Sequence, residues 1–345
     1  MCIRDRSVTI MTNGKKMTEN RNLDVDVLED EIREFRGTDK INEVEFKNNK
    51  IKKIDGLFVA EGIATSIDLA RKIGAVIEEN NIKVDENMET AIKKIEDMSL
   101  NAWPSHKMEL YDGWILRFSY FYTHRTNSVE QFGNSTLTWR EKIPYCESVY
   151  KRLGTPAVFK ISPLVSPDFD YVLENRGYAI QHTTNVMAMS MNAARLDTPY
   201  PDVTFCDNIP SEWIESLFRL KNTTNPIHRK VVPSMYQAIL KETICASIRM
   251  DNQIIATGLG ILDRDYIGIY AIHVKEEYRK HGYARQICTG LLKEGMKKGA
   301  QNAYLQVVEG NDNARVLYKS LGFHQLYTYW FRVQPDENGN FPPEK

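Results

Sequence analysis

The sequence predicts an α/β (α+β) chain with a mixed, mainly antiparallel central sheet and flanking helices. Two observations support this prediction. Between residues 245 and 274, three apolar stretches follow one another with only short polar turns between them, which is typical of an antiparallel meander. Strand and helix patterns then alternate towards the C-terminus, and the same alternation occurs earlier, in residues 93–197. The architecture is therefore expected in tandem, preceded by a small β-rich fragment.

The composition indicates a globular protein of two or three domains, because 345 residues exceed what one hydrophobic core usually organises. Apolar residues make up 42% and charged residues 26% of the chain, which argues against long disorder. The formal net charge is only -1, so a basic face for nucleic acid is not expected. No long apolar run and no signal peptide occur, which predicts a cytoplasmic protein without a membrane partner. The five cysteines are scattered without a C-x-x-C pair, so no metal site is expected.

Residues 1–20 lack a periodic apolar pattern and are expected to be disordered. Their first six residues resemble translated adapter sequence, so the natural protein is expected to begin further in, at Met11 or Met17. The elements expected in residues 21–92 are strands at 23–27, 44–46 and 56–60, turns at Gly37 and at Asn48-Asn49, and a helix at 66–72.

Residues 54–62 and 82–90 resemble the C-terminal part of thioredoxin-reductase-like flavoproteins. The features that would hold the cofactor are missing, because no G-x-G-x-x-G turn precedes the segment and no Gly-Asp segment follows Thr90. We therefore expect no FAD or NAD, and interpret residues 21–92 as a fused fragment or as a natural but inactive appendage. A flavin oxidoreductase stays an alternative that predicts a yellow purified protein.

The rest of the chain is expected to form two domains, 93–197 and 203–334, joined by a proline-containing linker at 195–201 and followed by a disordered tail at 335–345. The first should contain a helix near 95–100, strands at 113–118 and 120–128, a helix at 141–153 stopped by Gly154, a strand at 157–161, a helix at 169–175 and a strand at 184–191. The second should contain a strand at 203–206, helices at 212–221 and 233–240, strands at 245–250, 254–262 and 266–274, a helix opening near Ala284, a strand at 303–308 and a helix stopped by Gly322.

A polar loop joins the apolar strand ending at Val274 to the helix that opens near Ala284. Unpaired N–H groups and the helix dipole make such a helix start an anion site, and Gly282 lets the backbone approach a pyrophosphate. The alternative is a basic loop that only caps a helix. Positive or potentially positive side chains surround this point: Arg279, Lys280, His281 and Arg285.

The pattern Arg279-x-x-Gly282-x-Ala284 resembles the coenzyme A signature of the GNAT superfamily of N-acetyltransferases. A second pattern of that superfamily is matched by Asn311, Ala314, Leu317, Tyr318, Leu321, Gly322 and Phe323. The resemblance implies a GNAT fold and the transfer of acetyl from acetyl-CoA to a primary amine by direct attack in a ternary complex.

The resemblance also implies roles for individual residues. The strand at 272–274 should splay from the strand at 305–308 and bind the pantetheine arm, while Tyr318 should protonate the departing thiolate. The catalytic residues expected are Tyr318 and, as general base, Glu309, although many relatives use water instead. The residues expected at the cofactor are Ile272, His273, Val274, Arg279, Lys280, His281, Gly282, Tyr283, Ala284, Arg285 and Asn311. The alternatives are a core aromatic for Tyr318, a solvated loop carboxylate for Glu309, a helix cap for Asn311 and a satisfied structural histidine for His273.

Residues 93–197 end in a piece that resembles the close of the second signature but contain no counterpart of the first. They are interpreted as a degenerate GNAT-like domain that shapes the acceptor cleft. Residues that would line this cleft, if they are not simply core, are Trp103, Tyr111, Trp114 and Arg125. The loop at 222–232 is a further expected acceptor site, but it does not reveal which small-molecule or peptide amine is used. An acyl-CoA-binding sensor without turnover is the alternative function.

Overall fold

The computed structural model describes residues 9–11, 26–28, 30–36, 43–53, 76–78, 81–83, 86–336 and 339–341. The chain divides into two compact units, Met1–Thr65 and Ser66–Lys345, which are described separately. No helix within the described residues is both long and apolar enough to cross a bilayer.

The first unit contains two small sheets. One is a parallel pair of β1 (Thr9–Met11) and β2 (Asp26–Leu28), and the other is antiparallel, with β3 (Ile32–Arg36), β4 (Glu43–Phe46) and β5 (Ile51–Lys53). The expected strand at 44–46 is confirmed, and Val44 and Phe46 are buried. The turn at Asn48-Asn49 is also confirmed, since Asn49 has a φ of 65° between β4 and β5. The strand predicted at 23–27 overlaps β2 at residues 26–27, and its first three residues lie outside the described ones.

The second unit opens with a hairpin of β6 (Val76–Glu78) and β7 (Asn81–Lys83), while the strand and helix predicted at 56–60 and 66–72 lie outside the described residues. Its eleven-stranded sheet has the order β13 (Val203–Cys206), β14 (Glu242–Met250), β15 (Gln253–Asp263), β16 (Tyr266–Val274), β17 (Asn302–Val308), β12 (Ala179–Ser190), β18 (His324–Val333), β11 (Val158–Ile161), β10 (Val129–Gln131), β9 (Trp114–Phe118) and β8 (Lys107–Tyr111). Its described helices are α2 (Glu86–Ala102), α3 (Trp139–Arg152), α4 (Pro167–Asn175), α5 (Ser211–Leu220), α6 (Pro226–Gln237), α7 (Tyr283–Lys297) and α8 (Asp312–Leu321).

The sheet is mixed and mainly antiparallel, as the sequence predicts. Its two parallel contacts, β16 with β17 and β10 with β11, occupy corresponding places in two halves. Each half runs strand, helix, strand, helix, strand: β10, α3, β11, α4, β12 in the first and β16, α7, β17, α8, β18 in the second. The repeated order expected from the sequence is therefore present.

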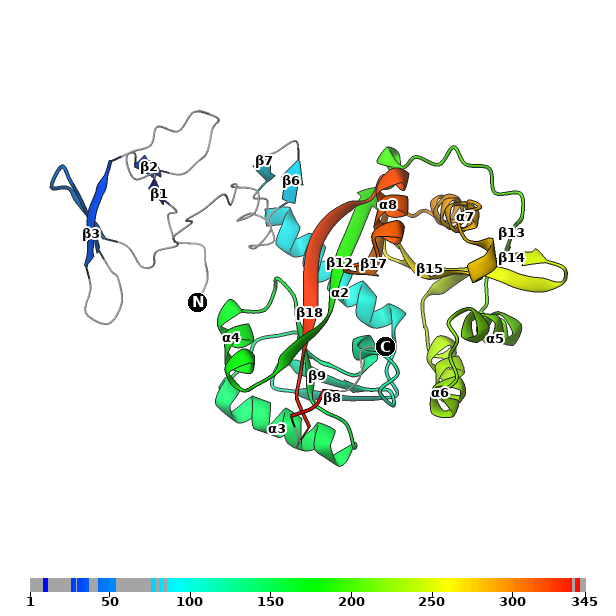
Figure 1. The fold of residues 1–345 in the computed structure, drawn as a ribbon, viewed down its shortest axis with the longest axis horizontal. Helices are drawn as coiled ribbons and strands as arrows, with labels where there is room; N and C mark the ends of the chain where they lie inside the picture. The colour runs from blue at the N-terminus through cyan, green and yellow to red at the C-terminus, as the bar shows by residue number, and fades with distance from the viewer. Residues whose placement is uncertain are drawn as a thin grey trace. The chain divides into compact units, whose positions relative to one another are not determined.

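The two halves exchange their last strands. β12 of the first half pairs with β17 of the second, while β18 of the second half pairs with β11 of the first. β12 and β18 also pair with each other, and Figure 1 shows them side by side in the middle of the sheet. The backbone hydrogen bonds of each half are thus completed by a strand of the other half. The two domains expected on either side of residues 197–203 did not include this exchange of strands.

Three buried clusters hold the helices to the sheet. The helices α2, α5 and α6 share one cluster, α7 and α8 share another with residues of β14–β17, and α3 and α4 pack in a third with β9–β11. Tyr270 belongs to the first cluster and Ile269 to the second, because successive residues of a strand point to opposite faces. The site region of β16 therefore separates an α5/α6 side from an α7/α8 side.

Several predicted bounds were wrong. The helix expected at 95–100 is α2, which begins at Glu86, so the domain boundary expected at 93 falls inside it. The expected strand at 120–128 is a loop with a short 3-10 helix, because the Asn127 side chain accepts hydrogen bonds from the Ser119 and Phe121 N–H groups. The helix α6 begins at Pro226, capped by Asn225, and passes through Pro233. Neither β8 nor β18 was among the elements predicted from the sequence.

Candidate active site

The site begins where β16 and β17 separate. Their parallel pairing runs from Tyr266 and Asn302 to Ile269 and Leu305, and it does not continue beyond that point. Ala271 has a φ of 51°, and the register of β16 against β15 shifts there. Since His273 and Val274 still pair with β15 on one side, the other edge of this segment presents backbone groups that no described strand uses. The splay implied by the sequence resemblance is present.

The loop between β16 and α7 forms an open helix start. Lys280 and Gly282 have φ values of 65° and 85°, and a Cβ added to Gly282 would meet no heavy atom within 4 Å. The first main-chain hydrogen bond of α7 joins the Gln286 N–H to the Gly282 oxygen at 3.0 Å. The three preceding N–H groups, of Tyr283, Ala284 and Arg285, have no acceptor within the helix. This geometry fits a pyrophosphate, which needs free N–H donors and open space beside the backbone.

The basic side chains of this loop are not equivalent. Arg279 Nε donates to the Val274 oxygen at 3.3 Å, and His281 Nδ1 donates to the Arg279 oxygen at 2.8 Å. Arg285 reaches across to α8, where it donates to Ser320 Oγ. Lys280 is exposed and makes no ion pair with a described residue. Arg279, His281 and Arg285 therefore help to position the loop, whereas Lys280 faces solvent.

The second predicted motif forms α8. Asn311 is its N-cap, and Asn311 Oδ1 accepts a hydrogen bond of 3.3 Å from the Ala314 N–H. Gly322 ends the helix with a φ of 110°. The capping alternative for Asn311 is therefore realised at Oδ1, and contact with a cofactor through its amide nitrogen stays a prediction.

Tyr318 lies on the buried face of α8. Its ring packs edge-on against Phe323 with centroids 6.1 Å apart, and only 9% of the residue is exposed. Burial raises the pKa of Tyr318 far above its usual range, so its hydroxyl carries a proton at neutral pH. No described residue hydrogen-bonds this hydroxyl, and its oxygen is not among the fully buried, unsatisfied atoms of the described residues. The ring thus serves the core while the O–H group remains available.

The two candidate bases differ in environment. Glu309 is exposed, and its N–H donates to the Thr183 oxygen at 2.8 Å. His273 is partly buried, and burial, together with the nearby cations Lys221 and Arg279, lowers its pKa to about 4. The His273 imidazole is therefore neutral at pH 7, which makes it an uncharged but weak proton acceptor.

Aromatic side chains from both halves meet on the α5/α6 side of the splay. Trp103 lies 6.2 Å from the ring centroids of both Tyr236 and Tyr270, and Tyr122 packs 5.2 Å from His228. The predicted loop at 222–232 mostly belongs to α6 and contributes His228 to this wall. Trp103 is therefore part of this aromatic wall, and its role in an acceptor cleft stays a prediction.

Arg125 is the other predicted residue that reaches this region. Arg125 Nε donates to Gln306 Oε1 at 2.7 Å and to the Tyr329 hydroxyl at 2.9 Å. Gln306 is the first residue of β17 beyond the parallel pairing. Sequence reasoning missed Gln306, although a lone polar residue within an apolar strand was a usable signal.

Tyr111 and Trp114 do not reach the splay of β16 and β17. Trp114 is buried in the cluster of α3 and α4, and Tyr111 stacks on Tyr145 with centroids 3.9 Å apart. For these two residues the core alternative is the correct one.

The chain is similar to known acetyltransferases. A family model described as "Probable histone acetyltransferase Rv0428c C-terminal" matches residues 89–331. A protein named "Uncharacterized N-acetyltransferase YobR" from Bacillus subtilis (strain 168) is 25% identical over 251 residues, which are 70% of this chain and 98% of that protein. A solved GCN5-related N-acetyltransferase from Kribbella flavida has the same fold, with a TM-score of 0.54 and 14% identity over 74% of this chain and 98% of that one. Because the family match begins at residue 89, it does not support the flavoprotein resemblance of the preceding segment.

Proposed function

This chain belongs to the family of the Rv0428c C-terminal acetyltransferases, within the GNAT superfamily, and we propose that it moves the acetyl group of acetyl-CoA onto a primary amine of a small molecule or peptide. The observation that carries this proposal is the splay after Ile269 and Leu305 beside the open start of α7 at Gly282. The strand edge and the start of α7 each offer backbone groups that no described strand or helix uses.

The proposed binding roles follow from these two sets of backbone groups. The N–H groups at the start of α7 would bind the pyrophosphate, with Arg279 and Lys280 adding positive charge. The free edge of Ile272, His273 and Val274 would hydrogen-bond the amide groups of the pantetheine arm. Arg285 would act indirectly, since its bond to Ser320 ties α7 to α8.

The chemistry proposed for the chain is direct acyl transfer in a ternary complex. Acetyl-CoA supplies, when bound, a thioester whose carbonyl carbon is open to attack by a neutral amine. Tyr318 holds a proton on its hydroxyl at neutral pH and would give it to the departing sulfur. Neither Glu309 nor His273 has the environment of a strong base, so we propose that water carries the amine proton away.

The acceptor is proposed to enter from the α5/α6 side. Trp103, Tyr122 and Tyr270 give that side an aromatic wall, which favours an amine carried on an apolar or aromatic body. Arg125, held by Gln306 and Tyr329, would fix the wall against β17.

The experiment that tests this function follows release of coenzyme A thiol from acetyl-CoA with a thiol reagent, across a panel of amines, using the full chain. Amine-dependent release supports acetyl transfer. Tight binding of acetyl-CoA without turnover on any amine would instead favour the sensor. A flavin oxidoreductase would require a yellow protein, which the same preparation tests by its absorption spectrum.

A further inference from the structure

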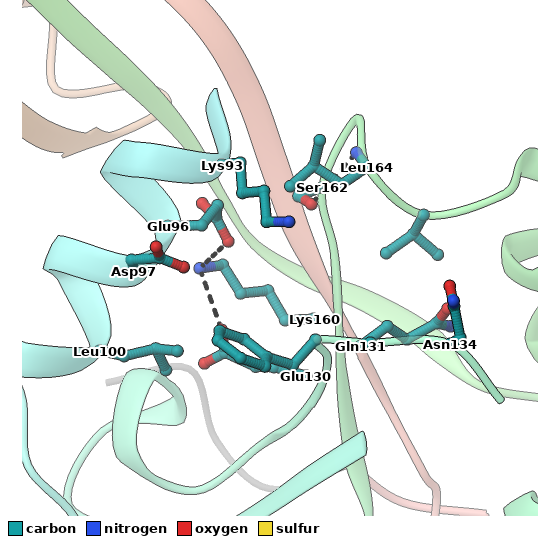
Figure 2. Close-up of a pocket in the computed structure, with 13 residues that line it drawn as sticks. Lys93, Glu96, Asp97, Leu100, Glu130, Gln131, Asn134, Lys160, Ser162 and Leu164 are labelled. Atoms are coloured by element: carbon teal, nitrogen blue, oxygen red, sulfur yellow. Dashed lines mark hydrogen bonds and ion pairs between the residues drawn. The ribbon is translucent and has the colours of Figure 1, made fainter. Parts of the chain in front are cut away.

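The first half has a splay of its own. β10 and β11 pair only at Val129 and Phe159, and beyond this point a cavity of about 310 Å³ opens between them. Figure 2 shows α2 along one side of the cavity, with Lys93, Glu96 and Asp97 on it, and Lys160 of β11 opposite. Its volume lies at the lower end of the range of small-molecule sites, ~300–1,000 Å³.

This cavity does not suit a second acetyl-CoA. The loop that corresponds to the pyrophosphate loop already binds an anion, since the Asp112 carboxylate accepts from the Thr136 N–H at 2.9 Å and the Leu137 N–H at 2.8 Å. Glu141 accepts from the Thr138 N–H at 2.8 Å in the same loop. Two carboxylates of the chain thus occupy the N–H groups of the three residues just before α3, so an external anion would have to compete with them for this loop.

The carboxylates of the cavity itself are already paired. Lys160 Nζ lies 2.6 Å from Glu96 and 3.5 Å from Glu130, and burial of Lys160 is outweighed by these two groups, which raise its pKa. Glu130 also contacts Arg117 at 3.3 Å. The third carboxylate, Asp97, lies 3.1 Å from Arg264. These four ionic contacts leave no unpaired carboxylate to attract a cation.

The groups that remain are donors. Lys93 is exposed at the cavity and has no ionic partner among the residues the structure describes. Gln131, which also lines the cavity, has an amide nitrogen that is buried without a hydrogen-bond partner. Apolar side chains also line the cavity, of which Phe132 and Leu164 are 53% and 38% exposed. One unpaired cation, one unpaired donor and apolar walls match an anion that has an apolar body.

We propose that this cavity is a second ligand site, separate from the acetyl-CoA site, that takes a small monocarboxylate with an apolar tail. The carboxylate would bind Lys93 and Gln131, and the tail would lie on Phe132 and Leu164. Such a ligand completes the cavity, because it satisfies the buried donor and covers apolar surface that is otherwise wet.

The test uses hexanoate as the probe and hexanamide as its neutral partner, with the full chain followed by calorimetry or NMR. Saturable binding of hexanoate, and much weaker binding of hexanamide, are expected. Lys93→Gln should weaken hexanoate binding by about fivefold. The matched control is Lys94→Gln, because Lys94 neighbours it on α2 but contacts Asp265 instead. Equal effects of the two substitutions, or equal binding of the two probes, would overturn the proposal.

A second variant blocks the cavity without disturbing the core. Leu164→Trp adds bulk at a partly exposed lip position and should abolish hexanoate binding in a protein with an unchanged circular dichroism spectrum. Gly282→Val should leave hexanoate binding unchanged, since Gly282 lies in the loop before α7, outside the lining of this cavity. This separates the second site from the proposed acetyltransferase site. Undiminished hexanoate binding by Leu164→Trp would contradict the assignment.

Discussion

The two halves of the sheet share one topology but differ in the loop that leads into the crossover helix. In the second half, the helix start after β16 has free N–H groups, a glycine at φ 85° and exposed positive charge. In the first half, the N–H groups of the loop just before α3 are bound by Asp112 and Glu141. In the first half, carboxylates of the chain itself bind the N–H groups of this loop. In the second half, the N–H groups at the start of α7 have no such carboxylate partner among the described residues.

This difference between the halves lies in the loops, whereas the order of strands and helices is the same in both. Both halves keep the parallel strand pair, the crossover helix and the splay, which packing and hydrogen bonding require. The exchange of β12 and β18 also makes each half necessary for the other's sheet. The first half thus supplies backbone partners and side chains, such as Arg125, to the second half.

Of the substitutions that test this difference between the halves, Tyr318→Phe is expected to have the largest effect on turnover. Tyr318→Phe keeps the ring in the core but removes the proton donor, so turnover should fall by about 10²–10⁴ with little change in acetyl-CoA affinity. The control is Tyr178→Phe in the first half, which loses a bond to Glu147 and should keep its turnover. Steady-state kinetics with a working amine measure both. A Tyr318→Phe rate within about twofold of wild type would show that the residue is only a core aromatic.

Each half also holds a histidine whose pKa is lowered to about 4, namely His124 in the first and His273 in the second. An unfolded histidine titrates near 6.5, so the unfolded state binds more protons between about pH 6.5 and 4. The unfolding free energy should therefore fall as the pH drops through this window, by up to about 1.4 kcal/mol per pH unit for buried His124. Urea unfolding of wild type and His124→Gln at pH 7 and 5 measures this. An equal loss in both proteins would contradict the role of His124.

Substitution of Asp112 is expected to have a smaller effect, which is on the stability of the first half. Hydrogen bonds from the Thr136 and Leu137 N–H groups hold the pKa of Asp112 well below its usual range, so this group stabilises the fold above about pH 4 and less as the pH falls. Asp112→Asn keeps the shape but loses the charge, and should melt a few degrees below wild type at pH 7. The gap should narrow near pH 3 in thermal melts, and a gap that does not depend on pH would argue against the carboxylate.

The smallest effect is expected from removing residues 1–85. No residue proposed at the site lies there, and the cut precedes α2. Acetyl-CoA affinity should stay within about twofold of the full chain, measured by calorimetry. A cut at 92 would not be equivalent, because it removes Ile92, which is 4% exposed in the α2 cluster. A large loss of affinity after the cut at 85 would show that the N-terminal segment contributes to the site.

Local sequence signals predicted much of this arrangement. The loop at Gly282 and the cap and stop of α8 follow from glycine conformation and capping, which depend on neighbours along the chain. Two of the errors were also local in origin. Pro233 was taken for a helix start although α6 passes through it, and the aromatic run near Tyr120 was taken for a strand although Asn127 folds it into a loop.

The exchange of strands could not be predicted in the same way. The pattern of β18 is compatible with any antiparallel partner, and its choice of β11 and β12 depends on how two distant segments meet. Arg125 and Gln306 are 181 positions apart in the sequence. For the same reason their contact could not be predicted from local patterns.

The most direct test of the central claim is a calorimetric titration of the full chain with acetyl-CoA. The closed loop of the first half and the open loop of the second predict one site per chain, and Gly282→Val should abolish it. Gly299→Val is the matched control, since Gly299 has a φ of 94° and equal space around its Cα but lies beyond the far end of α7. One site that is lost in Gly282→Val and kept in Gly299→Val is the expected result. Two sites in the wild-type protein, or one site that survives Gly282→Val, would contradict the account.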